Sequence, residues 1–171
     1  MRIVAGTFAG RDLTPPNDFR VRPTAEHVRA ALLDALGPDL PRARVLDLFA
    51  GTGALGLEAL SRGAARADFV ETRPASLHAL RANVAALRLR DRTRVFNRDA
   101  LPFAAALAPG SYDVAFVDPP YESRMLDRVL ASWRASGFAR VLAAEHARTH
   151  PLPPGADELA FGDTRITIYR G

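Results

Sequence analysis

The sequence predicts an α/β fold in which a doubly wound, mainly parallel sheet of seven strands ends in an antiparallel C-terminal hairpin. From Arg44 onward, apolar runs of strand length alternate with segments of helical periodicity, the pattern of repeated strand–helix–strand units. Uniformly apolar strands such as VAFV at residues 114–117 belong in a parallel sheet that helices cover on both faces. The last two strands instead flank Gly162-Asp163, a dipeptide typical of a tight hairpin turn.

An N-terminal extension precedes this core. Residues 2–14 interleave small and β-branched residues with two glycines, which predicts a short β-hairpin. Prolines then bracket an extended linker that carries arginines and ends at Pro23. Thr24 is a candidate N-cap for the next helix, which Gly37 and Pro38 terminate. The apolar face of that helix comprises Val28, Ala31, Leu32, Ala35 and Leu36.

The core is expected to contain five strands before the hairpin. They cover Val45 to Phe49, Ala67 to Glu71, Thr93 to Asn97, Tyr112 to Asp118 and Arg140 to Glu145. The helices between them are expected to begin near Ala54, Pro74, Ala100 and Arg124. Each helix lies between two consecutive strands, so we expect right-handed crossover connections. The C-terminal hairpin is predicted over residues 158–170.

Length and composition indicate one ordinary globular domain. The 171 residues divide into an extension, 1–23, and a core, 24–171. The absence of cysteine excludes a disulfide framework, a thiolate metal centre and a cysteine nucleophile. Four histidines without metal-like spacing give no reason to expect a metal site. No signal-like apolar segment and no run of 18 apolar residues occurs, so we expect a cytoplasmic protein with no membrane partner.

The charge balance is basic, and every cationic side chain except histidine is arginine. The 23 arginines and 19 acidic residues give a formal net charge of +4. Arginine binds phosphate bidentately and stacks on bases, so the balance is compatible with a nucleic-acid partner. An arginine-only, alanine-rich composition is equally explained by the coding bias of a genome. Charge alone therefore does not decide between the two.

A glycine-rich loop follows the first core strand in the segment LDLFAGTGALGLEAL. The strand ends near Asp47, the loop contains Gly51, Thr52 and Gly53, and the next helix begins directly afterwards. Open α/β sheets bind ligands at the carboxyl ends of their strands, where glycines let a ligand approach the backbone. Glu71 ends the next strand, where a carboxylate can accept hydrogen bonds from both hydroxyls of a ribose.

Two cofactor classes compete for this loop. Gly51, Gly53 and Gly56 also satisfy the G-x-G-x-x-G pattern of dinucleotide-binding proteins. Asp47 favours the second class, a cofactor with a cationic amino-acid tail, because a carboxylate ahead of the glycines attracts such a tail and repels the two phosphates of a dinucleotide. The chain also has no residues left for the separate substrate domain that nicotinamide enzymes usually carry.

Acidic residues follow two further strands. Asp99 comes after the third strand, where it can accept a hydrogen bond from an adenine amino group while Ala100 leaves room for the ring. A helix N-cap is the alternative interpretation of Asp99, and the two roles are compatible. Glu145 ends the fifth strand, where it can approach the substrate, although a solvated edge is the simpler interpretation for it.

The most specific chemical motif is YDVAFVDPPY, in which an apolar strand ends in Asp118, Pro119, Pro120 and Tyr121. Two consecutive prolines fix the backbone and remove two N–H donors, so the turn presents acceptors. The Asp118 carboxylate and the Pro119 carbonyl can hold an exocyclic amine with its lone pair directed at an electrophilic methyl group. Tyr121 can stack on a planar base. A rigid turn with a surface tyrosine is the alternative interpretation.

Together these segments resemble the class I S-adenosylmethionine-dependent methyltransferases. The chain is most similar to the bacterial small-subunit ribosomal RNA guanine-N2 methyltransferase family. The resemblance is carried by RIVAGTFAGRDL, VRPTAEHVRAALLDAL, LDLFAGTGALGLEALSRGA, Asn83 within LRANVAAL, and VDPPY. It implies a Rossmann-like methyltransferase that modifies one guanine of small-subunit rRNA within an assembling 30S particle, with S-adenosyl-L-methionine as cofactor. We expect the protein to be monomeric.

The resemblance also implies roles for individual residues. The turn Asp118, Pro119, Pro120 and Tyr121 would hold the flipped guanine. The implied cofactor-binding residues are Thr24, Asp47, Phe49, Ala50, Gly51, Thr52, Gly53, Glu71, Thr72, Asp99 and Ala100. The chain departs from the family after Glu71, because Thr72-Arg73-Pro74 stands where another polar or acidic residue would be expected. The ribose contact can therefore rest on Glu71 alone.

Two arginine clusters are candidates for binding RNA. We favour Arg11, Arg20 and Arg22, on the N-terminal extension, over the cluster around the third strand, which we interpret as a solvated helix end. The latter comprises Arg88, Arg90, Arg92, Arg94 and Arg98.

Three other functions remain open from the residues alone. A DNA adenine-N6 methyltransferase uses a similar D-P-P-Y turn, although such enzymes usually carry an added target-recognition domain. A protein-glutamine methyltransferase would favour asparagine at the first turn position. A non-catalytic cofactor-binding module is disfavoured by the intact turn.

Overall fold

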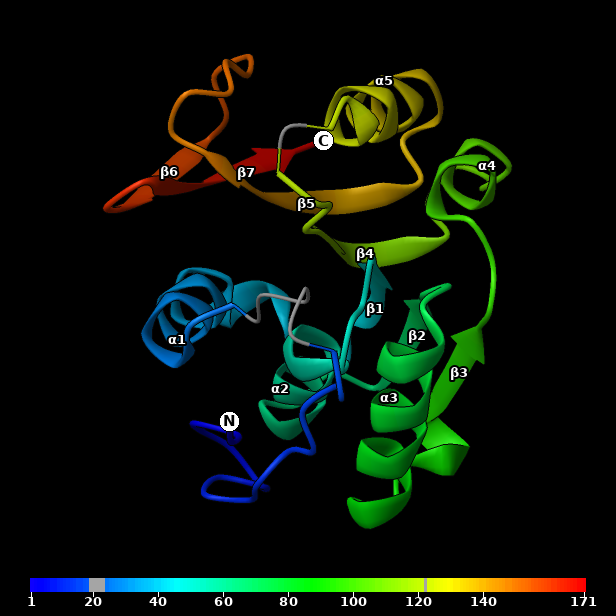
Figure 1. Cartoon of the computed structure of the whole chain (residues 1–171). Coiled ribbons are helices and arrows are strands. Elements are labelled where there is room, and N and C mark those ends of the chain that lie inside the picture. Colours follow the sequence, from blue (N-terminus) through cyan, green and yellow to red (C-terminus); the bar gives the residue numbers. More distant parts are fainter. Residues whose placement is uncertain (19–23, 122) are drawn as a thin grey trace.

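The computed structural model of the chain describes residues 1–18, 24–121 and 123–171. Within these residues, seven strands form one sheet in the order β3-β2-β1-β4-β5-β7-β6 (Figure 1). Strands β1 to β5 are parallel, whereas β7 is antiparallel to both β5 and β6. The predicted fold class is therefore confirmed.

The elements begin and end close to the predicted positions. The strands are β1 Arg44–Leu48, β2 Arg66–Val70, β3 Thr93–Phe96, β4 Tyr112–Val117, β5 Ala139–Ala147, β6 Asp157–Phe161 and β7 Thr164–Arg170. The helices are α1 Glu26–Ala35, α2 Ala54–Ser61, α3 Pro74–Ala86, α4 Ala100–Ala105 and α5 Met125–Ser136. Two short 3-10 helices, η1 Gly37–Asp39 and η2 Arg90–Arg92, precede β1 and β3.

Helices cover both faces of the sheet, as the uniformly apolar strands predict. Along β4, Val114 and Phe116 pack in the core that also contains buried residues of α1, α2 and α3. The alternating residues Ala115 and Val117 pack in a second core with α4 and α5. Figure 1 shows the two helical layers on either side of the strands. Both sides of the central strands are thus buried, which fixes their register and the position of their carboxyl ends.

The C-terminal hairpin turns at the predicted dipeptide. Phe161 pairs with Thr164, so the loop between β6 and β7 consists of Gly162 and Asp163. Gly162 has a φ of 57°, a left-handed conformation that glycine adopts without steric cost. This turn gives the sheet its antiparallel edge.

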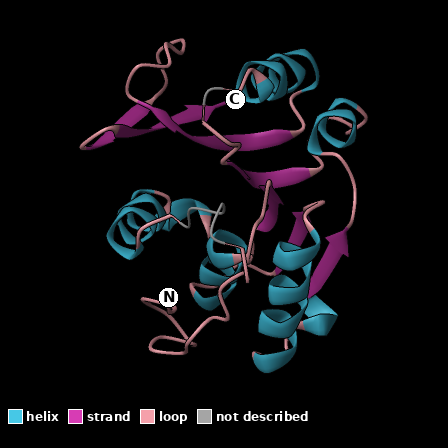
Figure 2. Cartoon of the chain, in the orientation of Figure 1, coloured by secondary structure: helices cyan, strands magenta, loops and turns pink. Residues whose placement is uncertain are grey.

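The N-terminal extension folds back on itself and packs against α2. A single antiparallel bridge joins Arg2 to Asp12, and the Leu13 N–H donates to the Met1 carbonyl, so the predicted hairpin is reduced to one bridge. Figure 2 shows this segment as a loop beside the helices. Gly6 lies so close to α2 that an added Cβ would be 1.9 Å from the Ser61 carbonyl oxygen. Contacts with the helix, more than strand pairing, hold this segment.

The start of α1 differs from the prediction. Ala25, not Thr24, is the N-cap residue, and no side chain caps this helix. The Thr24 hydroxyl is engaged elsewhere, as described below. Among the described residues, no helix combines the length and apolarity needed to cross a membrane.

Candidate active site at the carboxyl ends of β1 and β4

The glycine loop and the D-P-P-Y turn extend from neighbouring strands. Strand β1 pairs with β2 on one side and with β4 on the other. Strands β2 and β3 are added on one side of β1 and β4 and β5 on the other, so the strand order reverses between β1 and β4. Leu48, the last residue of β1, is in register with Val117, the last residue of β4. Asp118 therefore follows the strand next to the one that carries the glycine loop. This reversal point is where open α/β sheets bind ligands.

The glycine loop has a left-handed backbone at three positions. Phe49, Gly51 and Gly53 have φ values of 58°, 57° and 83°. This conformation is strained for a bulky residue such as Phe49, and such strain is concentrated at functional sites. The Ala50 N–H donates to the Val70 carbonyl and the Gly53 N–H to the Ala50 carbonyl, so the turn is tied to β2 and to itself.

The two glycines of the loop and Gly56 in α2 have different roles. A Cβ at Gly53 would lie 2.4 Å from Leu80, and one at Gly56 would lie 2.4 Å from the buried ring of Phe69. Both therefore serve the close packing of α2 against its neighbours. A Cβ at Gly51 would meet no atom within 4 Å. Gly51 thus faces open space, as a backbone that contacts a ligand must.

Asp47 lies almost completely buried beneath this loop. Only 2% of the residue is exposed, and its Oδ2 accepts a hydrogen bond of 3.0 Å from the Gly56 N–H. Burial, with a smaller contribution from the charge of Glu71, raises the pKa of Asp47 to about 8, even though the Gly56 hydrogen bond opposes the shift. A cationic ligand beside the loop would stabilise the charged carboxylate.

The raised pKa of Asp47 predicts a pH dependence of stability. The ligand-free folded protein retains this proton up to about pH 8, whereas the unfolded chain releases it near pH 3.8. Folding therefore takes up a proton between these values, and the contribution of Asp47 to the free energy of unfolding falls as the pH rises. In Asp47→Asn, whose amide oxygen can still accept from Gly56, this fall should disappear. Urea unfolding of both proteins across this range measures the difference, and parallel curves would contradict the assignment.

Glu71 lies at the end of β2 and binds the neighbouring backbone. Its Oε2 accepts a hydrogen bond of 2.8 Å from the Gly51 N–H, and its Oε1 accepts from the N–H groups of Thr72 and Arg73 at 3.0 Å each. The carboxylate is thereby held against the glycine loop. A ribose would share these oxygens with the backbone, since each has more than one lone pair.

Asp99 is the N-cap residue of α4, and its Oδ1 accepts a hydrogen bond of 3.0 Å from the Leu101 N–H. Asp99 remains exposed, and Ala100 is buried against the α4–α5 core. The capping interpretation is confirmed, and the carboxylate still lies after β3, on the same edge of the sheet as the glycine loop.

The D-P-P-Y turn is held by contacts from three other elements. The Thr24 hydroxyl lies 3.1 Å from Oδ2 of Asp118 and 3.1 Å from Oε2 of Glu145. The Tyr121 hydroxyl lies 2.9 Å from the Thr164 hydroxyl and 3.5 Å from Oε1 of Glu145. Residues before α1, in β5 and in β7 thus fix the positions of both functional ends of the turn.

The two carboxyl groups at this turn interact electrostatically. Burial raises the pKa of Asp118 well above its usual range, the charge of Glu145 raises it further, and the Thr24 hydrogen bond opposes these effects. A threonine hydroxyl has one proton and can donate to only one carboxylate at a time. Its second contact is a hydrogen bond only when that carboxyl group is itself protonated.

One residue of the site was misjudged from the sequence, and another was named there only as part of the family resemblance, without a role. Glu145 does not lie on a solvated edge as expected, because its carboxylate contacts Thr24 and Tyr121. Asn83, which is 2% exposed, donates to the carbonyls of Thr14 and Thr52 and so joins the N-terminal extension to the glycine loop. A polar amide on the apolar face of a predicted helix was the available signal for Asn83.

The predicted RNA-binding arginines are only partly described. Arg20 and Arg22 lie outside the described residues. Arg11 donates to the carbonyl of Ala86, the last residue of α3. That helix begins just after the Glu71 tip and is 13 residues long, about 18 Å of axial rise, so Arg11 is not brought together with the turn.

The arginine cluster around β3 is largely engaged with the protein. Arg92 donates to the carbonyls of Ala64 and Ala65, and Arg94 pairs with Asp68 at 2.6 Å. Arg98 lies over the ring of Phe96, 5.8 Å from its centre.

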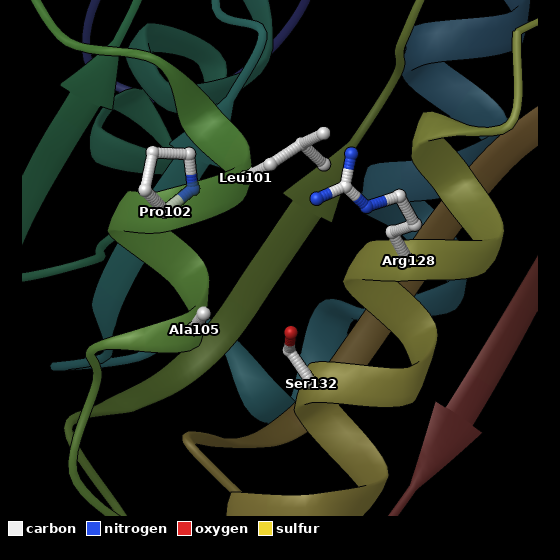
Figure 3. Close-up of a pocket in the computed structure, with 5 residues that line it drawn as sticks. All are labelled: Leu101, Pro102, Ala105, Arg128 and Ser132. Carbon is white, nitrogen blue, oxygen red and sulfur yellow. The ribbon is translucent and has the colours of Figure 1, made fainter.

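Two pockets flank these elements. One is lined by the turn residues Pro119, Pro120 and Tyr121 together with Glu145 and His146. The other lies between α4 and α5, where Arg128 and Ser132 face Leu101, Pro102 and Ala105 (Figure 3). Only the first contains residues of the D-P-P-Y turn.

Known proteins resemble the chain over nearly its whole length. A protein called ribosomal RNA small subunit methyltransferase D from Escherichia coli is 40% identical over 81% of this chain and 69% of its own. Its namesake from Haemophilus influenzae is 33% identical over 99% of this chain and 92% of its own. A hypothetical protein of Thermus thermophilus has a solved structure with a TM-score of 0.83 and 32% identity, covering 100% of this chain and 99% of its own. A family model described as Conserved hypothetical protein 95 matches residues 1–165, and the chain therefore belongs to that family.

Proposed function

We propose that this protein transfers a methyl group from S-adenosylmethionine to the exocyclic N2 amine of a guanine in small-subunit ribosomal RNA. The observation that supports the proposal is the pairing of β1 with β4, from whose ends the glycine loop and the D-P-P-Y turn extend. The names of the two relatives favour ribosomal RNA of the small subunit as substrate. The choice of guanine N2 follows from the family resemblance of the sequence.

The residues of the loop fit this cofactor. Asp47 and the loop from Phe49 to Gly53 would hold the methionine part, because the backbone at Gly51 is open and Asp47 suits an ammonium group. Glu71 and Thr72 would bind the ribose, and Asp99 and Ala100 the adenine. Thr24 would lie where cofactor and substrate meet, since its hydroxyl contacts Asp118. When bound, the cofactor supplies an electrophilic methyl group on a sulfonium.

Gly51→Ala tests the glycine loop. The substitution puts a side chain into the open space and is expected to weaken S-adenosylhomocysteine binding about tenfold or more, measured by calorimetry. Because Gly51 has a φ of 57°, alanine there should also cost about 1–2 kcal/mol of stability.

Gly110→Ala is the matched control for this variant. Gly110 has a φ of 67° and equally open surroundings, but it precedes β4 at the opposite end of that strand. The two variants should lose similar stability, and only Gly51→Ala should lose ligand affinity. Equal affinities in both would show that Gly51 does not contact the ligand.

The turn would act mainly by alignment. The Asp118 carboxylate and the Pro119 carbonyl accept the two N–H groups of the amine, which directs its lone pair at the methyl carbon. Tyr121, held through its hydroxyl by Thr164, stacks on the base. Asp118 would stabilise the positive charge that develops on the amine nitrogen during methyl transfer. The raised pKa of Asp118 makes this carboxylate a better acceptor for the proton that the amine then loses.

RNA would reach this turn as a nucleotide flipped out of its stack. We assign phosphate contacts to Arg11, Arg20 and Arg22 and propose that a monomer acts on an assembling 30S particle. The position of Arg11 at the far end of α3 implies a footprint that extends along the N-terminal extension.

Labelled S-adenosylmethionine tests the proposed function directly. The protein is incubated with small-subunit rRNA, with 30S particles from a strain lacking the modification, or with DNA, and the methylated nucleoside is identified by mass. N2-methylguanosine in the RNA or particles is the expected product. Label appearing only as N6-methyladenine in DNA would overturn the substrate and favour the alternative activity.

A further inference from the structure

A second carboxylate stands beside the one that holds the target amine. The register of β4 with β5 pairs Val117 with Ala144, so Asp118 and Glu145 follow as neighbours on adjacent parallel strands. The Thr24 hydroxyl lies 3.1 Å from an oxygen of each. Glu145 also lines the same pocket as Pro119, Pro120 and Tyr121. Asp118 and Glu145 are therefore joined through the Thr24 hydroxyl, and Glu145 also borders the pocket next to the prolines and Tyr121 of the turn.

The contacts of Glu145 place it on the side of the turn where a stacked base would lie. Its Oε1 is 3.5 Å from the hydroxyl of Tyr121, the residue assigned to stacking. Its Oε2 reaches towards Asp118 through Thr24. A base held by Asp118 and covered by Tyr121 would thus present its edge to Glu145.

Guanine and adenine differ at the ring nitrogen next to the amine. In guanine the N2 amine is flanked by N1–H, a donor, whereas in adenine the N6 amine is flanked by N1 with a lone pair. An ionised carboxylate only accepts hydrogen bonds. A second carboxylate at this place therefore matches guanine and repels adenine, and a site built around such a match strongly rejects the analogue that lacks the donor.

We propose that Glu145 accepts the N1–H of the target guanine and so determines specificity for guanine over bases with an unprotonated N1. The inference rests on the proposed function, because it assumes that a guanine N2 is methylated. It adds a residue that reads the base without holding the reacting amine. It also gives a role to a second carboxylate that lies next to Asp118 despite their mutual repulsion.

2-Aminopurine is the probe that isolates this contact. It keeps the exocyclic amine at position 2 but has a lone pair at N1 and lacks O6, so the contact with Glu145 is isolated by comparing wild type with Glu145→Gln on both RNAs. Once mass mapping has located the methylated nucleotide, a synthetic rRNA fragment carrying guanine or 2-aminopurine at that position is assembled with small-subunit proteins. The ratio of kcat/KM for the two RNAs is measured with wild type and with Glu145→Gln, whose amide can donate to N1.

The expected result is a strong wild-type preference for guanine that falls about 100-fold in Glu145→Gln. Glu145→Asp, which keeps the charge, should retain the preference even if its rate is lower. Glu158→Gln, an exposed residue of β6, makes the same chemical change away from the turn and should leave both rates unchanged.

The outcomes separate this inference from the proposed function. No methylation of the guanine RNA by wild type would reject the proposed function itself. Methylation by wild type with an equal loss of both rates in Glu145→Gln would show that Glu145 only supports Thr24 and Tyr121, which overturns the inference. Thermal unfolding of each variant identifies any loss of rate that comes from misfolding. If Glu145→Gln is misfolded, the preference for guanine is compared between wild type and Glu145→Asp instead.

Discussion

Asp118→Ala is expected to lower kcat for methyl transfer by about 100- to 1,000-fold, the usual cost of removing one preorganised polar group from a reacting centre. Without the carboxylate, the amine loses one of its two acceptors and its lone pair is no longer aligned with the methyl carbon. The positive charge that grows on nitrogen also loses its nearest counter-charge. Single-turnover methylation of the RNA substrate at saturating cofactor measures this effect.

The affinity for S-adenosylhomocysteine should be unaffected in Asp118→Ala, because the glycine loop is held by Val70, Glu71 and Asn83 rather than by the turn. Asp113→Ala is the matched control, since it removes a carboxylate from the other end of β4, where Asp113 pairs with Arg44. Wild-type kcat in Asp118→Ala would show that the turn does not hold the substrate amine.

Asp118→Asn separates alignment from charge. The amide keeps an acceptor oxygen but has no negative charge and cannot take the proton. A variant that recovers most of the activity lost in Asp118→Ala would show that alignment dominates. Activity as low as that of the alanine variant would show that the charge is needed, as the raised pKa of Asp118 suggests for a proton acceptor.

Local sequence patterns could predict the sheet because its strands are defined by local signals. The apolar run of β4 ends at Asp118, after which Pro119 and Pro120 have no N–H to donate to a neighbouring strand, and Gly162-Asp163 is typical of a two-residue hairpin turn. The candidate site follows from the same signals, since the carboxyl ends of parallel strands share one edge. Neighbouring strand tips were therefore predictable before any tertiary contact was known.

Contacts between distant segments could not be predicted in the same way. Thr24 is a residue type typical of an N-cap, but its hydroxyl instead contacts Asp118 and Glu145, which are 94 and 121 positions away in the sequence. Tertiary hydrogen bonding here replaces the local one. A charged residue near the end of a strand, such as Glu145, is usually exposed. Only the register of β5 against β4 shows that Glu145 lies next to Asp118.

The buried contact between α1 and α2 is a further example of a contact that local sequence patterns do not predict. Arg29 and Glu58 are both 0% exposed, and their side chains pair at 3.4 Å. Oε1 and Oε2 of Glu58 also accept hydrogen bonds of 3.0–3.2 Å from the N–H groups of Val4 and Ala5. Charged residues are rarely buried unless they are paired, so nothing in a local pattern predicts this arrangement. One carboxylate thus joins two helices and the N-terminal extension.

Glu58→Gln is expected to lower the free energy of unfolding by about 3–5 kcal/mol, because it leaves the Arg29 charge buried without its counter-charge. The neutral amide also replaces one acceptor oxygen with a donor that faces the Val4 and Ala5 N–H groups. Urea denaturation of wild type and variant measures the loss. The exposed pair of Glu26 with Arg2 provides the control, and Glu26→Gln should cost about 1 kcal/mol or less.

The same variant tests whether the N-terminal extension supports the site. Asn83 bonds both Thr14 in the extension and Thr52 in the glycine loop, so loosening the extension at Val4 and Ala5 should also loosen the loop. Under conditions where Glu58→Gln remains folded, its affinity for S-adenosylhomocysteine should therefore fall, whereas that of Glu26→Gln should not. If the urea concentration at the midpoint of unfolding were the same for Glu58→Gln and wild type, the assigned energetic role of Glu58 would be wrong. A stability loss without any change in affinity would limit Glu58 to joining the helices and leave Asn83 sufficient to hold the loop.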